Sequence, residues 1–347
     1  MAHYKHILTI HPEAGKINIL SFSPTKRLLA SGSSGGLVQI WDLKSRGSTK
    51  ELQLRSAVLS LAWDASSGRL FIGCKNGTIL SLDPSTQRGL SVIRVSDRNV
   101  GSGTARTFPV DALAINCAGK VAHTAGRHVL FYHLSSHQFP VSIKALPGPI
   151  DLDYGSDFQA WIRAQSLHYI DDNKLAVCYG KLNCIVTWDL TNQQMLWRST
   201  PIFGIFSINK KGDRIVVPDA HSGVHVIPLA ENKSSFVLRY YPDPSANGIN
   251  FGVAFTSNNV LVASGHRGRI VIWSVFNRRI TQVLNHPDHW FRAFAAKDDD
   301  GISYIAAATG GSSEIMVFAA PYVYRQRKLV PTDENHAKIM VNQIVFL

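Results

Sequence analysis

The sequence predicts an all-β fold in which one hairpin unit recurs about seven times. Residues 28–43 carry an apolar run ending in Ser-Gly, a Gly/Ser-rich turn and a second apolar run, which together indicate a β-hairpin. Residues 261–275 are almost a copy of this hairpin, and 174–190 repeat it with a longer turn. Four weaker versions complete a series spaced roughly every 40 to 55 residues, which is typical of a propeller array.

Each hairpin follows a stretch with small or apolar residues at alternating positions, as expected of a half-buried innermost strand. A more polar segment follows each hairpin, as expected of an outer strand that must resist edge pairing. The hairpins lie at 28–43, 69–84, 120–134, 174–190, 214–229, 261–275 and 304–320. The innermost strands are predicted at 16–24, 57–64, 110–117, 164–171, 203–210, 251–257 and 290–297. The outer strands are predicted at 50–55, 91–95, 142–145, 236–239 and 280–283.

Three hairpins close on a tryptophan: Trp41 and Trp188 precede an aspartate, and Trp273 precedes a serine. On the basis of these residue pairs and of the repeated hairpins, the chain resembles the WD40-repeat β-propeller family over nearly its whole length. The resemblance implies a seven-bladed WD40-like β-propeller of four-stranded antiparallel blades. It does not select a function, because one fold hosts many functions.

WD40 blades share a buried hydrogen-bond chain that links this Trp to a Ser or Thr on the second strand, a His before the first and an Asp in the turn. The first blade resembles this pattern in Trp41, Ser31 and His11, but its turn has no Asp. The sixth blade offers Trp273 and Ser264. The resemblance therefore implies diverged repeats with a structural role for these polar residues.

We expect one WD40-like propeller domain over residues 1–347. Residues 4–10 are the natural strand to close the last blade, since WD40 rings usually close by joining the two termini. Residues 322–330 are an alternative outer strand for that blade. Residues 331–347 form a tail of uncertain placement, which either packs on the ring or belongs to a shortened form of a longer chain.

The composition indicates a globular protein with a formal net charge of +12. This charge would attract polyanions. The basic residues are dispersed, with the densest groups at 278–279 and 325–328, so a solubilising surface charge is the simpler interpretation. The four scattered cysteines indicate reduced thiols, and no signal peptide or membrane-spanning run is evident. We expect an intracellular protein, cytoplasmic or nuclear.

No catalytic motif is present: the chain has no nucleophile elbow, P-loop or dinucleotide fingerprint. His286 and His289 have a spacing compatible with metal, but no third ligand accompanies them. We therefore expect no enzymatic activity, no metal, no cofactor and no small-molecule substrate.

The starts of three innermost strands carry arginine and tryptophan, the residue types that dominate interaction hot spots. Long loops at 96–107, 146–160 and 241–248 lead into innermost strands, and WD40 partners usually bind on that face. The alternative is that the tryptophans pack between blades and the arginines are merely solvated. The predicted partner-binding residues are Arg106, Trp161, Arg163, Trp290 and Arg292.

The function most consistent with these features is a non-enzymatic scaffold that presents a preorganised face to protein partners within a complex. The alternative is a basic propeller that binds nucleic acid or an anionic membrane surface. An enzyme with a site near the axis is the least supported, because titratable groups do not converge at the strand starts. The placement of the charges, which separates the first two functions, is not given by the sequence.

Overall fold

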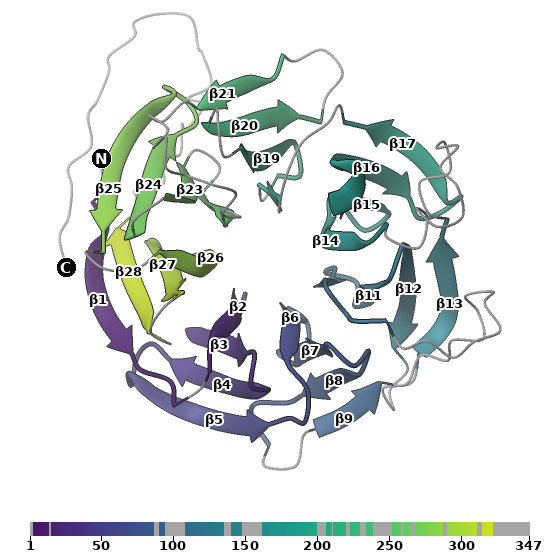
Figure 1. Cartoon of the computed structure of the whole chain (residues 1–347), viewed down its shortest axis with the longest axis horizontal. Helices are drawn as coiled ribbons and strands as arrows, with labels where there is room; N and C mark the ends of the chain where they lie inside the picture. The colour runs from purple at the N-terminus through teal and green to yellow at the C-terminus, as the bar shows by residue number, and fades with distance from the viewer. Residues whose placement is uncertain are drawn as a thin grey trace, which may run out of the picture.

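Each predicted hairpin forms the two middle strands of a four-stranded antiparallel sheet, and the residues described by the computed structural model form seven such sheets. The sheets stand around a common axis as the blades of a propeller (Figure 1). The predicted all-β propeller fold is therefore confirmed. The structure describes residues 3–13, 15–86, 90–93, 108–134, 140–147, 162–199, 206–209, 211–219, 223–229, 234–238, 252–257, 260–265, 268–286, 290–310 and 314–321.

The strand that precedes each hairpin lies nearest the axis (Figure 1). We call the face of the ring at which these strands begin the upper face, and the face at which they end the lower face. Because each blade is an antiparallel meander, the second strand also ends at the upper face. The innermost strands are β2 (Ile17–Phe22), β6 (Val58–Trp63), β10 (Leu113–Ile115), β14 (Ala164–Tyr169), β18 (Ser207–Ile208), β22 (Val253–Ser257) and β26 (Phe291–Asp299).

The hairpin strands explain why the first apolar run of each repeat shows little alternation. Neighbouring blades cover both faces of these strands, so successive side chains are buried. The five residues of β7, for example, are all buried. The second strands are β3 (Leu28–Ser33), β7 (Leu70–Cys74), β11 (Lys120–Ala125), β15 (Lys174–Tyr179), β19 (Arg214–Asp219), β23 (Val260–Gly265) and β27 (Ile302–Thr309). The third strands are β4 (Leu37–Asp42), β8 (Ile79–Leu82), β12 (His128–Leu134), β16 (Cys184–Asp189), β20 (Gly223–Pro228), β24 (Arg269–Ser274) and β28 (Ile315–Pro321).

The outer strands form the circumference of the ring and are more exposed. Residues 194–198 form the outer strand of the fourth blade, consistent with the polar segment that the sequence predicts after each hairpin. A short 3₁₀ turn, η2 (Gly180–Leu182), joins β15 to β16. The outer strands are β5 (Gly47–Gln53), β9 (Leu90–Ile93), β13 (Pro140–Leu146), β17 (Gln194–Arg198), β21 (Phe236–Leu238), β25 (Arg279–Asn285) and, in the last blade, β1 (Lys5–Ile10).

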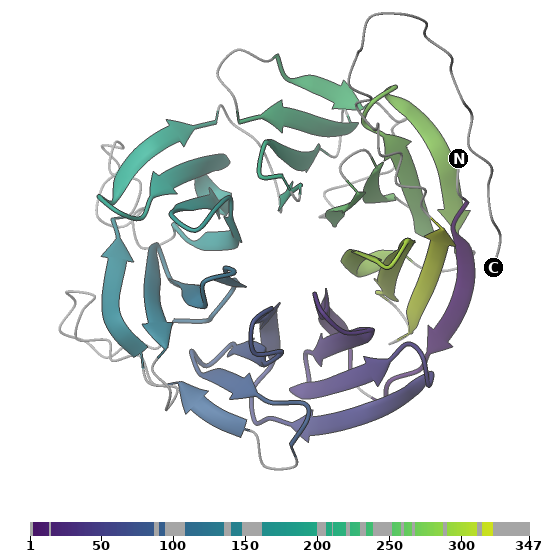
Figure 2. The same ribbon diagram turned by 180° about the vertical axis from the view of Figure 1, so that it is seen from behind.

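The ring is closed by its N-terminal strand. β1 pairs antiparallel with β28, and the two strands lie side by side in both views of the molecule (Figures 1 and 2). The backbone of Tyr4 also exchanges two hydrogen bonds with the Gln282 carboxamide on β25, at 2.7 and 2.8 Å. The N-terminal strand is therefore attached to both the sixth and the seventh blade. Residues 322–330 and 331–347 lie outside the described part of the chain.

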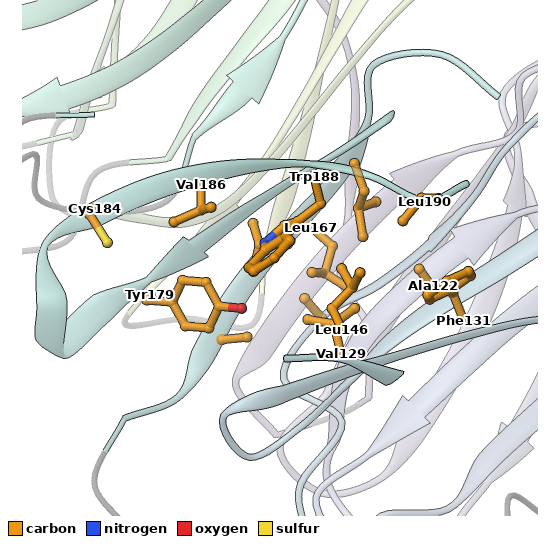
Figure 3. Packing of buried hydrophobic residues seen from close by; sticks show 14 of the residues in the cluster. Ala122, Val129, Phe131, Leu146, Leu167, Tyr179, Cys184, Val186, Trp188 and Leu190 are labelled. Carbon is orange, nitrogen blue, oxygen red and sulfur yellow. The ribbon is translucent and has the colours of Figure 1, made fainter. Parts of the chain in front are cut away.

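The core is divided among the interfaces between blades. Between the third and fourth blades, Phe131 and Leu146 pack against a cluster that includes Leu167 and Trp188 (Figure 3). Of the four free cysteines, Cys117 is exposed and the other three are buried. Each blade therefore depends on its neighbours for the burial of its apolar faces.

The WD40-type hydrogen-bond chain is present in part in the first blade. The Trp41 indole N–H donates to Ser31 Oγ at 3.2 Å, as the resemblance implied. His11 is exposed and makes no hydrogen bond to Ser31 within the described residues. In the sixth blade Trp273 pairs with Leu261, as Trp41 pairs with Leu29 in the first blade. The residue two positions after Leu261 therefore corresponds to Ser31, and that residue is Ala263. The prediction of Ser264 is wrong by one residue.

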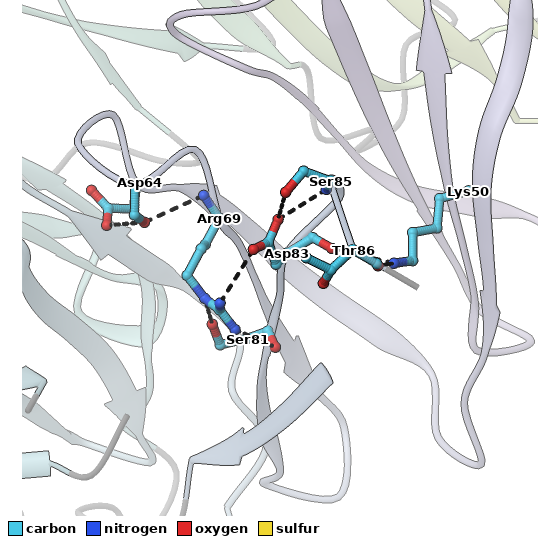
Figure 4. A network of polar contacts seen from close by, with 8 residues as sticks. Lys50, Asp64, Arg69, Ser81, Asp83, Ser85 and Thr86 are labelled. Atoms are coloured by element: carbon cyan, nitrogen blue, oxygen red, sulfur yellow. Dashed lines mark hydrogen bonds and ion pairs between the residues drawn. The ribbon is translucent and has the colours of Figure 1, made fainter. Parts of the chain in front are cut away.

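A polar network at the lower face joins the first two blades (Figure 4). Lys50 on β5 donates to the backbone carbonyls of Asp83, at 3.2 Å, and Thr86. Arg69 in turn donates to Ser81 Oγ at 2.7 Å and pairs with the Asp83 carboxylate at 3.8 Å. Hydrogen bonds from Ser85 hold the pKa of Asp83 below its usual value. These contacts fix neighbouring blades at their lower ends.

Candidate functional site

A β-bulge recurs near the start of four innermost strands, at the upper face. The register of β2 against β3 skips one residue, and the same skip occurs in β6, β14 and β26. A bulge leaves the extra residue unpaired and changes the direction of its side chain. The extra residues are Asn18, Leu59, Gln165 and Arg292.

Arg292, one of the predicted partner-binding residues, occupies such a bulge in the seventh blade. Its guanidinium donates to Asn18 Oδ1 at 3.0 Å, and Asn18 Nδ2 donates to the Val58 carbonyl at 2.9 Å. These two bonds connect the seventh, first and second blades across the upper face. Arg292 remains exposed, so one side of a positioned guanidinium is open to solvent.

Arg163, a second predicted residue, directly precedes β14 and is exposed. Its charge acts on Asp111, which precedes β10 in the neighbouring blade. Burial raises the pKa of Asp111, and the positive charge of Arg163 opposes that rise. The two residues therefore couple the third and fourth blades electrostatically at the upper face.

Trp290, the third predicted residue within the described part of the chain, lies directly before β26. Its ring covers Gly310, because a Cβ at that position would lie 2.5 Å from Trp290 Cζ2. The Gly310 N–H also donates to the Trp290 carbonyl at 2.7 Å. The residue is nevertheless 39% exposed, so its ring is neither buried between blades nor free in solvent.

The described residues of the predicted site share a face but do not form one cluster. Arg163 belongs to the fourth blade, whereas Trp290 and Arg292 belong to the seventh, on the other side of the axis (Figure 1). Arg106 and Trp161 lie outside the described residues.

Sequence reasoning missed three polar residues of the upper face, Asn18, Asp111 and Gln165. The bulges that expose Asn18 and Gln165 depend on strand pairing, which has no local signal in the sequence. A polar residue one position into an otherwise apolar innermost strand is the one hint that the sequence offered. The Gln165 carboxamide lies over Gly180, where a Cβ would overlap it.

Within the described residues, no three His, Cys, Asp or Glu side chains gather in a way that could hold a metal ion. His286 Nε2 lies 3.6 Å from the Glu314 carboxylate, and His289 lies outside these residues. No helix in the described part of the chain is long and apolar enough to cross a membrane.

Comparison with known proteins identifies the repeat and the architecture. Residues 3–42 match the family model described as "WD domain, G-beta repeat". This segment runs from β1, in the last blade, through β4, in the first, so the matched repeat spans the closure of the ring. No curated protein sequence matches the chain.

Among solved structures, the chain is similar to the β-propeller domain of Cps50 (Swd1) from Myceliophteria thermophila. The TM-score is 0.69 at 16% sequence identity, and the match covers 89% of this chain and 99% of that one. At this identity the likeness establishes the architecture and leaves the function open. The chain is a β-propeller, and its residues 3–42 match the WD40 repeat.

Proposed function

We propose that this propeller is a non-enzymatic scaffold that presents its upper face to protein partners as a subunit of a complex. WD40 propellers typically serve as protein-interaction scaffolds, which supports the class. The observation that carries the proposal is the positioning of large, exposed side chains on this face. Arg292 is held by Asn18, and Trp290 is held against Gly310.

The mechanism is preorganisation. A side chain already fixed by its neighbours loses little conformational entropy when a partner docks, at a saving of about 0.5–1.5 kcal/mol per side chain. Arginine and tryptophan combine large contact area with directed polar groups, so they contribute strongly to interaction hot spots. Arg163 supplies a further exposed guanidinium from the fourth blade.

The test is recovery of partners by affinity purification on the intact chain and on an Arg163→Ala, Trp290→Ala variant. We expect the variant to lose at least about tenfold in partner affinity, because it removes two hot-spot residue types from one face. The matched control is Phe276→Ala, Arg279→Ala, which removes an exposed aromatic and an exposed arginine from the lower face. Circular dichroism verifies that both variants remain folded.

Equal loss of partners in both variants would contradict a binding site on the upper face. Recovery that disappears after nuclease treatment would instead favour the nucleic-acid alternative.

A further inference from the structure

The upper face carries a group of exposed positive charges. Exposed lysines and arginines surround the axis on the upper face, at the starts of innermost strands, in the hairpin turns and in the loop between β5 and β6. They are Lys16, Arg55, Lys75, Arg127, Arg163, Arg269 and Arg292, which we call the basic ring.

Carboxylates on the same face do not balance this charge within the described residues. Glu13 is exposed there, whereas Asp111 and Glu314 are half-buried. Glu314 already pairs with His286. Among the described residues of the upper face, the charge of the basic ring is therefore the larger one, and such a group of cations attracts negatively charged partners.

On the lower face, several charges are paired with one another. Arg27 lies 3.6 Å from the Asp299 carboxylate, and Lys297 lies 3.4 Å from the same group. Lys174 pairs with Asp171 at 3.5 Å. On the lower face some basic residues thus neutralise local carboxylates, whereas on the upper face the exposed cations of the basic ring outnumber the exposed carboxylates among the described residues.

We propose that the basic ring binds an extended, carboxylate-rich peptide segment of a partner protein. This inference rests on the proposed function and specifies the chemistry of the partner. Most members of the ring are arginines, whose planar guanidinium binds a carboxylate through two parallel hydrogen bonds. The cations come from several blades, so an extended segment that crosses the upper face would meet more than one of them.

Two other polyanions fit the same face less well. Binding of single-stranded nucleic acid relies on aromatic platforms for base stacking, and Trp290 is the one large exposed aromatic on the upper face among the described residues. A membrane would require apolar side chains beside the cations. The exposed apolar residues instead lie on outer strands at the circumference, as do Val92, Leu196 and Val283.

The test is fluorescence anisotropy with the full chain and a labelled peptide of alternating Glu and Gly. The same peptide with Lys in place of Glu, a single-stranded oligouridine and phosphatidylserine vesicles serve as competing probes. Charge reversal at Lys16→Glu, Lys75→Glu, Arg269→Glu should weaken binding of the acidic peptide at least about tenfold. The control Lys44→Glu, Lys211→Glu, Arg279→Glu changes the net charge equally, but on exposed residues of the lower face, and should change affinity less than about twofold.

Equal weakening by both triple variants would overturn the proposal, because net charge alone would then explain binding. Tighter binding of oligouridine or vesicles than of the acidic peptide would overturn it too. The same variants distinguish failure of this inference from failure of the proposed function. If partner recovery is lost in the Arg163→Ala, Trp290→Ala variant but survives charge reversal of the ring, the upper face binds partners and the acidic-peptide inference is wrong.

Discussion

A chain that lacks residues 1–10 should lose the cooperative unfolding of the ring and most of its β-sheet signal at temperatures where the intact chain is folded. The reason is that β1 is the outer strand of the last blade and pairs with β28, which lies at the far end of the sequence. Lys5 pairs with Ala319, and Ile10 pairs with Ile315. Removal of this strand leaves the seventh blade with an unpaired edge.

The size of the effect follows from the burial at this strand. Ile10 is buried, and Ile7 and Leu8 pack against the same cluster. Their loss would expose Ile315 and Val317 of β28, which are fully buried in the intact ring. Because each fully buried aliphatic side chain contributes about 1.5–3 kcal/mol, the deletion should lower the free energy of unfolding by more than about 5 kcal/mol. That is comparable with the whole stability of an ordinary domain.

Circular dichroism during thermal unfolding, together with size-exclusion chromatography, measures this effect. A synthetic peptide of residues 1–10 provides the control, because its addition should restore the transition if pairing with β28 is the cause. A truncated chain that melts cooperatively within a few degrees of the intact chain would show that the seventh blade does not need β1.

The sequence contained the local part of the fold and little of the long-range part. Each hairpin could be predicted because its apolar runs and Gly-containing turn are contiguous. The bounds of the outer strand β17 could not, because Met195 and Leu196 are exposed at 44% and 49% and lack the alternation of a half-buried strand. Exposed edge strands have weak sequence signals, since no burial constrains them.

The candidate site was harder to predict than the fold, for a physical reason. Arginine and tryptophan at strand starts could be identified from position and residue type. The partner of Arg292 is Asn18, at the other end of the chain, and a hydrogen bond between such residues exists only once the ring closes. The basic ring likewise depends on which turns share a face, so the dispersed charge of the sequence became interpretable only in three dimensions.

Acid should destabilise the protein between about pH 6.5 and pH 4, in part through His123 on β11. Register places His123 where Ser31 stands in the first blade, and Tyr132 where Trp41 stands. The two rings pack edge to face with centroids 5.6 Å apart, in place of the Trp–Ser hydrogen bond. His123 is 4% exposed, and burial lowers its pKa to about 4.

A buried histidine that stays neutral when folded binds fewer protons than the same residue in the unfolded chain. Its contribution is therefore fully present above the unfolded pKa and is lost as the pH falls through 6.5 toward 4. With its pKa lowered from 6.5 to about 4, His123 reduces the free energy of unfolding, relative to neutral pH, by about 2 kcal/mol at pH 5 and by roughly 3 kcal/mol at pH 4. His168, whose pKa burial also lowers to about 4, adds to the same window.

Urea unfolding at pH 7.5 and pH 5 measures the loss in the intact chain and in His123→Phe, which keeps an aromatic ring beside Tyr132 but cannot be protonated. The variant should lose about 2 kcal/mol less between the two pH values than the intact chain, whatever its stability at pH 7.5. His133→Phe, on the exposed side of β12, controls for removal of a histidine as such. If His123→Phe loses as much free energy of unfolding as the intact chain, protonation of this side chain does not drive acid unfolding. If it loses less, protonation of His123 in the third blade contributes to acid unfolding.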